Sequence, residues 1–236
     1  MANALIQVRN LRKEYSMGEE TVVALRDVNL DIEKGQIVCI FGTSGSGKST
    51  LLNQLAGLER PTSGSVTIGS VPVDRLSENA LAEFRQKHLG FVFQSYNLLP
   101  TMTAEENVAR PLMFRGIPLE QRKQAAAEML ELVGLSGRAK HYPSQMSGGQ
   151  QQRVGIARAF VTRPAVVYAD EPTGNLDSKT TVEVMEMIHS FARKFHQTIV
   201  MVTHDPQMAE YADRILTLKD GVIIADERRG CKDEEE

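Results

Sequence analysis

One stretch decides the fold of this chain: Gly42-Thr43-Ser44-Gly45-Ser46-Gly47-Lys48-Ser49-Thr50. It fits the pattern G-x-x-x-x-G-K-[ST] and lies between the apolar run of residues 37–41 and a segment with leucines at helical spacing, residues 51–55. In such a setting the glycines let the backbone wrap around phosphate, N–H groups form an anion nest, and the helix directs its positive end there. The sequence therefore predicts a phosphate-binding loop in a P-loop NTPase core.

Within this loop each residue type has an expected task. Lys48 is predicted to reach the β and γ phosphates of a nucleotide, and the Ser49 hydroxyl to coordinate Mg²⁺. The other nucleotide-binding positions are Gly42, Ser44, Gly45, Ser46, Gly47 and Thr50. The alternative is a flexible Gly/Ser loop that matches by accident, which average residue usage produces in roughly 1% of chains this long. The loop alone does not identify the reaction, since kinases, GTPases and motor ATPases share it.

The overall composition is that of an ordinary folded protein. The chain has 236 residues, of which 42% are hydrophobic and 24% charged. A formal net charge of −3 argues against a nucleic-acid partner held by phosphate neutralisation. We see neither a long apolar run nor a secretory signal, and Cys39 and Cys231 lack metal-ligand spacing. These features predict a cytoplasmic protein.

Short apolar runs predict a mostly parallel sheet whose strands are buried on both faces. The runs are residues 37–41, 90–93, 165–168, 198–202 and 215–218. Residues 178–195 carry apolar side chains at helical spacing and complete a strand–helix–strand unit. Residues 5–8, 22–25 and 66–68 predict short strands of an amino-terminal antiparallel β subdomain. Residues 95–161 hold no strand run and predict an inserted α-helical subdomain.

A second motif is the apolar run of residues 166–169, which ends in Asp170 and Glu171. In doubly wound sheets the ligand lies beyond the carboxyl ends of the strands. We therefore expect Asp170 to hold the Mg²⁺ shell and Glu171 to accept a proton from an attacking water. The simpler interpretation is that two carboxylates merely cap a strand before Pro172.

The segment Ser147-Gly148-Gly149-Gln150 resembles the signature motif of ABC-type ATPases, which other P-loop families lack. Further residues occur in the order of that family, and the resemblance covers residues 5–230. They are Tyr15 in the early strand region, Gln94 after a strand, Asn175-Leu176-Asp177 beyond the two carboxylates, and His204 at the end of the next strand. A kinase shares the P-loop but has no use for the signature motif or His204.

The resemblance implies that two ATP molecules are bound between two copies of the chain. In the family the signature residues Ser147, Gly148, Gly149 and Gln150 form a second anion site, at a helix beginning near Gln150, and bind the γ-phosphate held by the partner. A head-to-tail homodimer results, and Asp177 would link its two sites. ATP and Mg²⁺ are the implied substrate and metal.

Three residues take roles from the resemblance alone. Gln94 would contact Mg²⁺ and the attacking water, His204 would bind the γ-phosphate and help to position Glu171, and Tyr15 would stack on adenine. Each also has a structural interpretation. Gln94 is then a solvated loop residue, His204 a strand-end histidine satisfied by backbone, and Tyr15 a half-buried aromatic residue.

Residues 91–100 and 169–178 are similar to the branch with lipoprotein-release, macrolide-efflux and cell-division cassettes. The resemblance implies an ATP-hydrolysing ABC transporter subunit at the inner face of the cell membrane, which powers export or force transmission by a separate integral-membrane permease. The coupling surface is expected around residues 95–115, where apolar side chains gather unless they form subdomain core. They are Tyr96, Leu98, Leu99, Met102, Leu112, Met113 and Phe114. The alternative is a soluble ABC-type ATPase of assembly or repair without a membrane partner.

The expected layout is one ABC ATPase domain, residues 1–230. It combines a catalytic core, residues 1–94 and 162–230, with the helical subdomain, residues 95–161, and an acidic tail follows at residues 231–236.

Overall fold

The structure is a computed structural model that describes residues 4–18 and 20–229. The chain divides into two compact units, Met1–Leu81 with Thr198–Glu236, and Ala82–Gln197. These borders differ from the predicted subdomain borders, which stay a prediction. Cys231 and the predicted acidic tail lie outside the described residues. Within residues 4–18 and 20–229, no helix has the length and apolar character that a membrane span requires.

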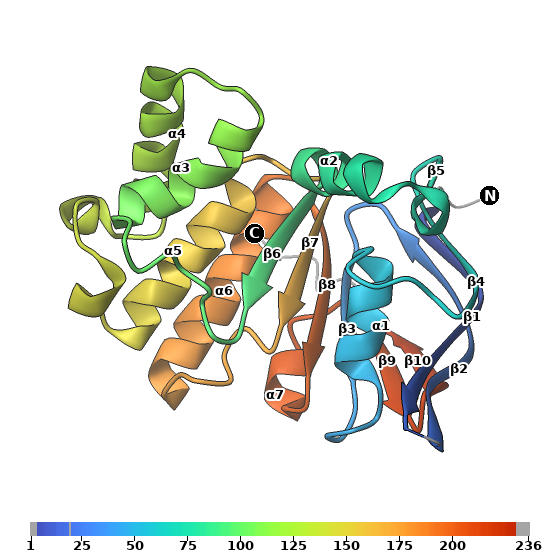
Figure 1. Ribbon diagram of the computed structural model, residues 1–236. Helices are drawn as coiled ribbons and strands as arrows, with labels where there is room; N and C mark the ends of the chain where they lie inside the picture. Colours follow the sequence, from blue (N-terminus) through green and yellow to red (C-terminus); the bar gives the residue numbers. More distant parts are fainter. Residues whose placement is uncertain (1–3, 19, 230–236) are drawn as a thin grey trace. The chain divides into compact units, whose positions relative to one another are not determined.

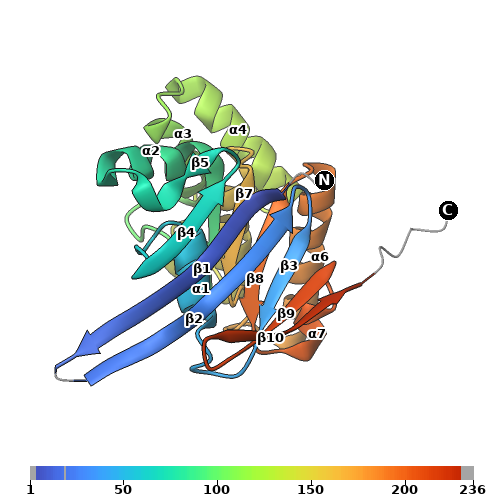
Figure 2. The ribbon, with the colours of Figure 1, turned by 90° about the vertical axis from the view of Figure 1, so that its right-hand side faces the viewer.

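The first unit contains an antiparallel sheet with the strand order β2-β1-β4-β5. Its strands are β1 (Ala4–Met17), β2 (Glu20–Glu33), β4 (Ser63–Ile68) and β5 (Val71–Pro72). Figure 2 shows β1 and β2 side by side along their length, with β4 next to β1. The predicted antiparallel subdomain is confirmed. Strands β1 and β2 are longer than predicted, at 14 residues each, because their pairing continues through register shifts beside polar residues.

The same unit contains strands in the order β10-β9-β3-β8. They are β3 (Ile37–Phe41), β8 (Thr198–Thr203), β9 (Arg214–Lys219) and β10 (Val222–Arg228). Strand β3 pairs in parallel with both β8 and β9, whereas β10 pairs antiparallel with β9. Helix α1 (Lys48–Leu55) follows β3 and buries Leu51, Leu52 and Leu55, and α7 (Pro206–Ala209) follows β8. The unit also has the short helix η1 (Val73–Arg75).

The second unit contains β6 (Leu89–Phe93) and β7 (Val166–Asp170), which pair in parallel (Figure 1). Its longer helices are α3 (Ala104–Phe114), α4 (Leu119–Leu132), α5 (Gly148–Phe160) and α6 (Ser178–Lys194), with η2 (Ser136–Arg138) and η3 (Pro143–Gln145) between α4 and α5. Helix α2 (Glu78–His88) contains the border between the units. The predicted α/β class with mostly parallel strands is confirmed.

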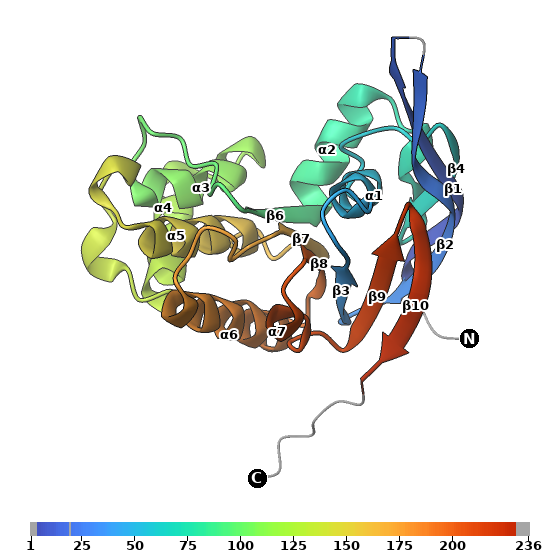
Figure 3. The ribbon, with the colours of Figure 1, turned by 90° about the horizontal axis from the view of Figure 1, so that it is seen from below.

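Helices α5 and α6 lie side by side in the second unit (Figure 3). Phe160 of α5 meets Phe191 of α6 edge to face, with 5.4 Å between ring centroids. Helix α5 begins at Gly148, two residues before the predicted start near Gln150, because Ser147 caps it. Both signature glycines, Gly148 and Gly149, are therefore helical, and their N–H groups belong to the first turn of α5.

Candidate nucleotide-binding site

The loop between β3 and α1 has the backbone that its glycines predict. Gly45 and Gly47 adopt left-handed conformations with φ of 79° and 101°. A Cβ atom placed on Gly42 would lie 2.3 Å from the carbonyl oxygen of Leu218. These glycines are therefore required by backbone conformation and by close approach.

Several polar groups in this loop and at the start of α1 are left incompletely satisfied within the first unit. Lys48 is 6% exposed, its Nζ donates to the carbonyl oxygen of Thr43 at 2.8 Å, and no carboxylate of the described residues in this unit pairs with it. The Ser46 hydroxyl is buried without a hydrogen-bond partner. The N–H groups of Gly45, Gly47 and Lys48 have no acceptor in this part of the chain. Phosphate oxygens are suited to all of these groups, so the loop fits a nucleotide.

Tyr15 lies on β1 and is linked to α1 through Glu59. Its hydroxyl donates to Glu59 Oε2 at 2.6 Å, and Asn53 Nδ2 of α1 donates to Glu59 Oε1 at 3.0 Å. Burial and the hydrogen bond to Glu59 raise the pKa of Tyr15. The ring remains half-exposed, with Lys13 Nζ 5.0 Å from its centroid. The structure thus ties this aromatic residue to the helix that carries exposed Ser49 and half-buried Thr50.

His204 lies at the same strand edge as the phosphate-binding loop. Phe41, the last residue of β3, is paired with Thr203, the last residue of β8. Gly42 and His204 are the first residues after these parallel strands, and His204 is exposed. The register therefore brings the histidine to the start of the loop, as expected for a group that meets the same phosphates.

In the second unit the predicted carboxylates lie beside Gln94. Phe93 of β6 is paired with Asp170 of β7, so Gln94 and Glu171 follow paired residues at one strand edge. Asn175 Nδ2 donates to the carbonyl oxygen of Gln94 at 3.0 Å. Glu171 has a left-handed backbone with a φ of 41°, which non-glycine residues seldom adopt. The oxygen donors gathered here are of the type that Mg²⁺ prefers.

The signature residues form the capped first turn of α5. Ser147 N donates to Gln150 Oε1 at 3.1 Å, and Gln150 N donates to Ser147 Oγ at 3.3 Å. The N–H groups of Gly148 and Gly149 have no acceptor among the described residues of the second unit. A Cβ atom on Gly149 would lie 2.6 Å from Thr180 Cγ2, so glycine permits α6 to approach closely.

Asp177 caps α6 at this same contact. Its Oδ1 accepts from Thr180 N at 3.0 Å, and its Oδ2 accepts from Thr180 Oγ1 at 2.7 Å. These hydrogen bonds from Thr180 lower the pKa of Asp177. Sequence reasoning missed Thr180, for which the N-cap position of Asp177 was the available signal.

The predicted residues fall into two groups, one in each unit. The first unit holds Tyr15, the loop residues Gly42 to Thr50 and His204, and the second holds Gln94, Asp170, Glu171, Ser147 to Gln150 and Asp177. Their roles toward ATP and Mg²⁺ stay predictions.

Comparison with known proteins gives a consistent family. Residues 25–174 match the family described as ABC transporter. An uncharacterised ABC transporter ATP-binding protein of Thermotoga maritima is 48% identical over 229 residues, which are 96% of this chain and 96% of that protein. The macrolide export ATP-binding/permease protein MacB of Escherichia coli K12 is 46% identical over 220 residues, which are 93% of this chain but 34% of MacB.

Two solved structures of the ATP-binding cassette MJ0796 also match. One is dimeric, and the other is a dimeric post-hydrolysis state bound to ADP and Pi. Each has a TM-score of 0.89 and covers 95% of this chain and 99% of the solved chain, at 44% and 43% identity respectively.

Proposed function

We propose a function from the premise that this chain belongs to the ABC transporter family of ATP-hydrolysing, ATP-binding proteins. Two copies of the chain, arranged head to tail, enclose two ATP molecules and drive a separate membrane subunit. One observation carries the proposal. Two glycine-rich helix N-termini, those of α1 and α5, have N–H groups that lack acceptors within their own unit. A single bound nucleotide needs the first, and the second is then available to the nucleotide of another copy.

The solved relatives support this arrangement, since both MJ0796 structures are dimeric and one holds ADP and Pi. ATP that binds between two copies favours the closed dimer by mass action. In the proposal Ser147, Gly148 and Gly149 meet the γ-phosphate from the partner's loop, and Asp177 lies at the contact between the two sites.

The proposal gives the remaining residues their tasks. Tyr15 stacks on adenine, and Lys48 and the loop N–H groups hold the phosphates. Ser49, Gln94 and Asp170 hold Mg²⁺, which neutralises charge on the phosphate oxygens when bound. Glu171 accepts a proton from the attacking water, and His204 binds the γ-phosphate.

The substitution Glu171→Gln tests the general base. We expect the variant to bind ATP, to lose roughly 100-fold or more in kcat, and to persist as an ATP-bound dimer in sedimentation. Glu186→Gln makes the same change at an exposed position of α6 and should hydrolyse ATP normally. Normal steady-state hydrolysis by Glu171→Gln would contradict the assignment.

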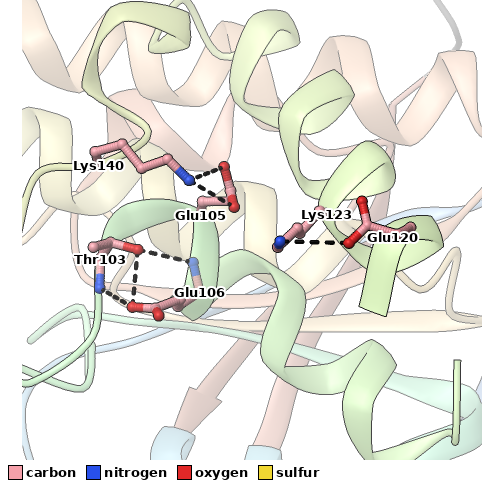
Figure 4. Close-up of polar contacts among 6 residues, drawn as sticks. All are labelled: Thr103, Glu105, Glu106, Glu120, Lys123 and Lys140. Carbon is pink, nitrogen blue, oxygen red and sulfur yellow. Dashed lines mark hydrogen bonds and ion pairs between the residues drawn. The ribbon is translucent and has the colours of Figure 1, made fainter. Parts of the chain in front are cut away.

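A groove on the second unit supports the proposal of a membrane partner. It has a volume of about 280 Å³. It is lined by Met102, Thr103, Glu105, Glu106, Ala109, Arg110, Met113, Leu119, Arg122, Lys123 and Lys140. Figure 4 shows part of its polar rim, where Lys140 pairs with Glu105 at 3.0 Å and Thr103 forms a capping box with Glu106. The side chains of Met102, Met113 and Leu119 line the groove together with this rim, and an apolar centre with a polar rim is typical of protein interfaces.

The apolar side chains expected around residues 95–115 differ in their exposure. Of the seven predicted, Phe114 and Leu99 are 53% and 40% exposed, Leu112 is buried at 8% exposure and belongs to the core, and the other four are half-buried. In the proposal this surface receives a segment of the membrane subunit at the cytoplasmic face of the membrane. MacB is named as an ATP-binding/permease protein, so its name joins the two parts in one protein, which supports such a partner here.

Purification from native membranes tests the membrane partner. We expect a tagged chain to recover an integral-membrane protein and the groove variant Met113→Asp to recover much less of it. Leu132→Asp, at an exposed position of α4 outside the groove, is the control and should recover the partner. Recovery of the wild-type chain only from the soluble fraction would favour the alternative ATPase without a membrane partner.

A further inference from the structure

Arg158, in the last turn of α5, holds main-chain oxygens rather than a carboxylate. Its NH1 donates to the carbonyl oxygen of Asn97 at 2.5 Å and its NH2 to that of Tyr96 at 2.8 Å. No carboxylate of the described residues in the second unit pairs with Arg158. Burial lowers the pKa of Arg158 to about 10. A cation in this position loses hydration, so its two hydrogen bonds to the loop are the compensation that the structure provides.

The loop that Arg158 holds has an uncommon backbone. Tyr96 and Asn97 are both left-handed, with φ of 61° and 48°. Tyr96 N donates to the carbonyl oxygen of Phe93 at 3.2 Å, and Asn97 N to that of Ser95 at 2.6 Å. This turn begins shortly after Gln94, which is the first residue beyond β6. Contacts that hold the turn therefore also hold the position of Gln94.

The same turn lies along α5 as far as the signature residues. A Cβ atom on Gly155 would lie 3.7 Å from the carbonyl oxygen of Tyr96, and one on Gly148 would lie 2.7 Å from Tyr96 Oη. The turn therefore extends from Arg158 toward the first residue of the helix.

Helix α5 also holds the segment after Glu171. Gln152 Nε2, from the same helix, donates to the carbonyl oxygen of Pro172. Asn175 of that segment donates in turn to the carbonyl oxygen of Gln94. Helix α5, the turn after Gln94 and the segment after Glu171 are thus joined by side-chain hydrogen bonds to main-chain oxygens.

We infer that Arg158 is a positioning residue for ATP hydrolysis, which holds the turn at Tyr96 and Asn97 and thereby keeps Gln94 beside Glu171. The inference rests on the proposed role of Gln94. The phosphate-binding loop belongs to a different segment, so Arg158 affects turnover rather than the binding of ATP. Lysine does not replace it fully, because only a guanidinium presents a rigid fork of donors to two acceptors.

A double-mutant cycle tests the inference with the full chain. The steady-state kcat and KM for ATP are measured for the wild type, Arg158→Met, Gln94→Ala and the double variant. We expect Arg158→Met to lower kcat by about tenfold or more and to change KM for ATP by less than about twofold. In the Gln94→Ala background, the same substitution should change kcat by less than about twofold, because its effect passes through Gln94.

Arg153→Met is the matched control, because it makes the same substitution on the same helix. Arg153 donates to Glu183 and to the carbonyl oxygen of Val133, away from the turn at Tyr96 and Asn97. The kcat of Arg153→Met should therefore stay near that of the wild type. If Arg158→Met does not fold, Arg158→Lys enters the same cycle, with a smaller loss of kcat expected. An equal loss of kcat in both Gln94 backgrounds, or no loss at all, overturns the inference alone. Absence of ATP hydrolysis by the wild type contradicts the proposed function itself.

Discussion

The N-termini of α1 and α5 are both rich in glycine, yet they are completed differently. Helix α1 follows Gly47, which makes no side-chain cap, and its loop contains buried Lys48 and the unpartnered hydroxyl of Ser46. Helix α5 follows Ser147, whose side chain exchanges hydrogen bonds with Gln150 in a capping box. The N-terminus of α1 leaves buried polar groups unsatisfied in its own unit. The N-terminus of α5 is instead capped by the side chains of its own residues.

This difference indicates which part of the proposed ATP site a single chain can supply without a second copy. Buried polar groups without partners cost stability, and a ligand that satisfies them removes the cost. In the proposed arrangement the loop before α1 binds ATP in one chain. The turn at α5 is capped by its own residues and leaves only the N–H groups of Gly148 and Gly149 without acceptors in its unit, so in the proposal it contributes when another copy presents a phosphate.

The largest effect is expected at the first N-terminus, from Lys48→Met. Loss of the cation that is proposed to contact the phosphates should lower kcat for ATP hydrolysis by about 100-fold or more. The free energy of unfolding without nucleotide should stay equal or rise, because an apolar side chain replaces a buried ammonium that has no carboxylate partner in its unit. Steady-state kinetics and urea unfolding measure both quantities. Hydrolysis near the wild-type rate would mean that the two N-termini do not differ as described.

The second prediction concerns the other N-terminus, where Ser147→Arg should block ATP-dependent dimerisation. A bulky cation at the cap would occupy the space that a partner's phosphate needs, while ATP binding by the single chain should change by less than about threefold. Sedimentation in the Glu171→Gln background measures the dimer. Ser136→Arg, at an exposed position of the same unit, is the control. A dimer that survives Ser147→Arg would refute the shared site.

The third prediction sharpens the claim that the α1 side binds nucleotide alone. Tyr15→Ala should weaken ATP and GTP binding by about threefold to tenfold through lost stacking. Tyr15→Phe keeps the ring and loses only the hydroxyl group with its hydrogen bonds to Glu59 and Thr50, so the dissociation constants of this variant should stay near those of the wild type. Titration calorimetry measures both variants, and unchanged binding by Tyr15→Ala would remove this residue from the site.

The smallest effect is structural and is expected only at the capped N-terminus. Ser147→Ala should lower the free energy of unfolding by about 1 kcal/mol, because Gln150 N loses its acceptor, and Ser147→Gly by only a few tenths of a kcal/mol. Urea unfolding of the nucleotide-free chain measures the two losses. Equal stability of Ser147→Ala and the wild type would show that the capping box does not stabilise α5.

The sequence predicts the buried strands better than the exposed ones. Residues 37–41 were predicted as a strand and form β3, because a continuous apolar run is typical of a strand buried on both faces. Strands β1 and β2 are longer than predicted, since they continue past Asn10 and Asp27, which have positive φ and resemble turn residues in the sequence. Helix α2 was not predicted, and it buries only Leu81, so its apolar pattern is weak.

The candidate site was predictable where a motif carries it. The phosphate-binding loop and the signature residues are contiguous, so residue types and spacing are sufficient to find them. Arg158 is not contiguous with the turn that it holds, and only tertiary packing brings it to Tyr96. A single sequence does not reveal such a residue, because nothing local distinguishes it, whereas the N-cap position of Asp177 was a local signal for Thr180.

The central claim is that one functional site takes its phosphate-binding loop from one chain and its signature residues from another. Mixing Lys48→Met with Ser147→Arg tests it most directly, because each variant alone lacks one half of every site. In a mixed dimer, the intact loop of the Ser147→Arg chain meets the intact signature residues of the Lys48→Met chain. We predict that ATP hydrolysis reappears on mixing, well above the sum of the two separate rates. A mixture no more active than its components would contradict the shared site.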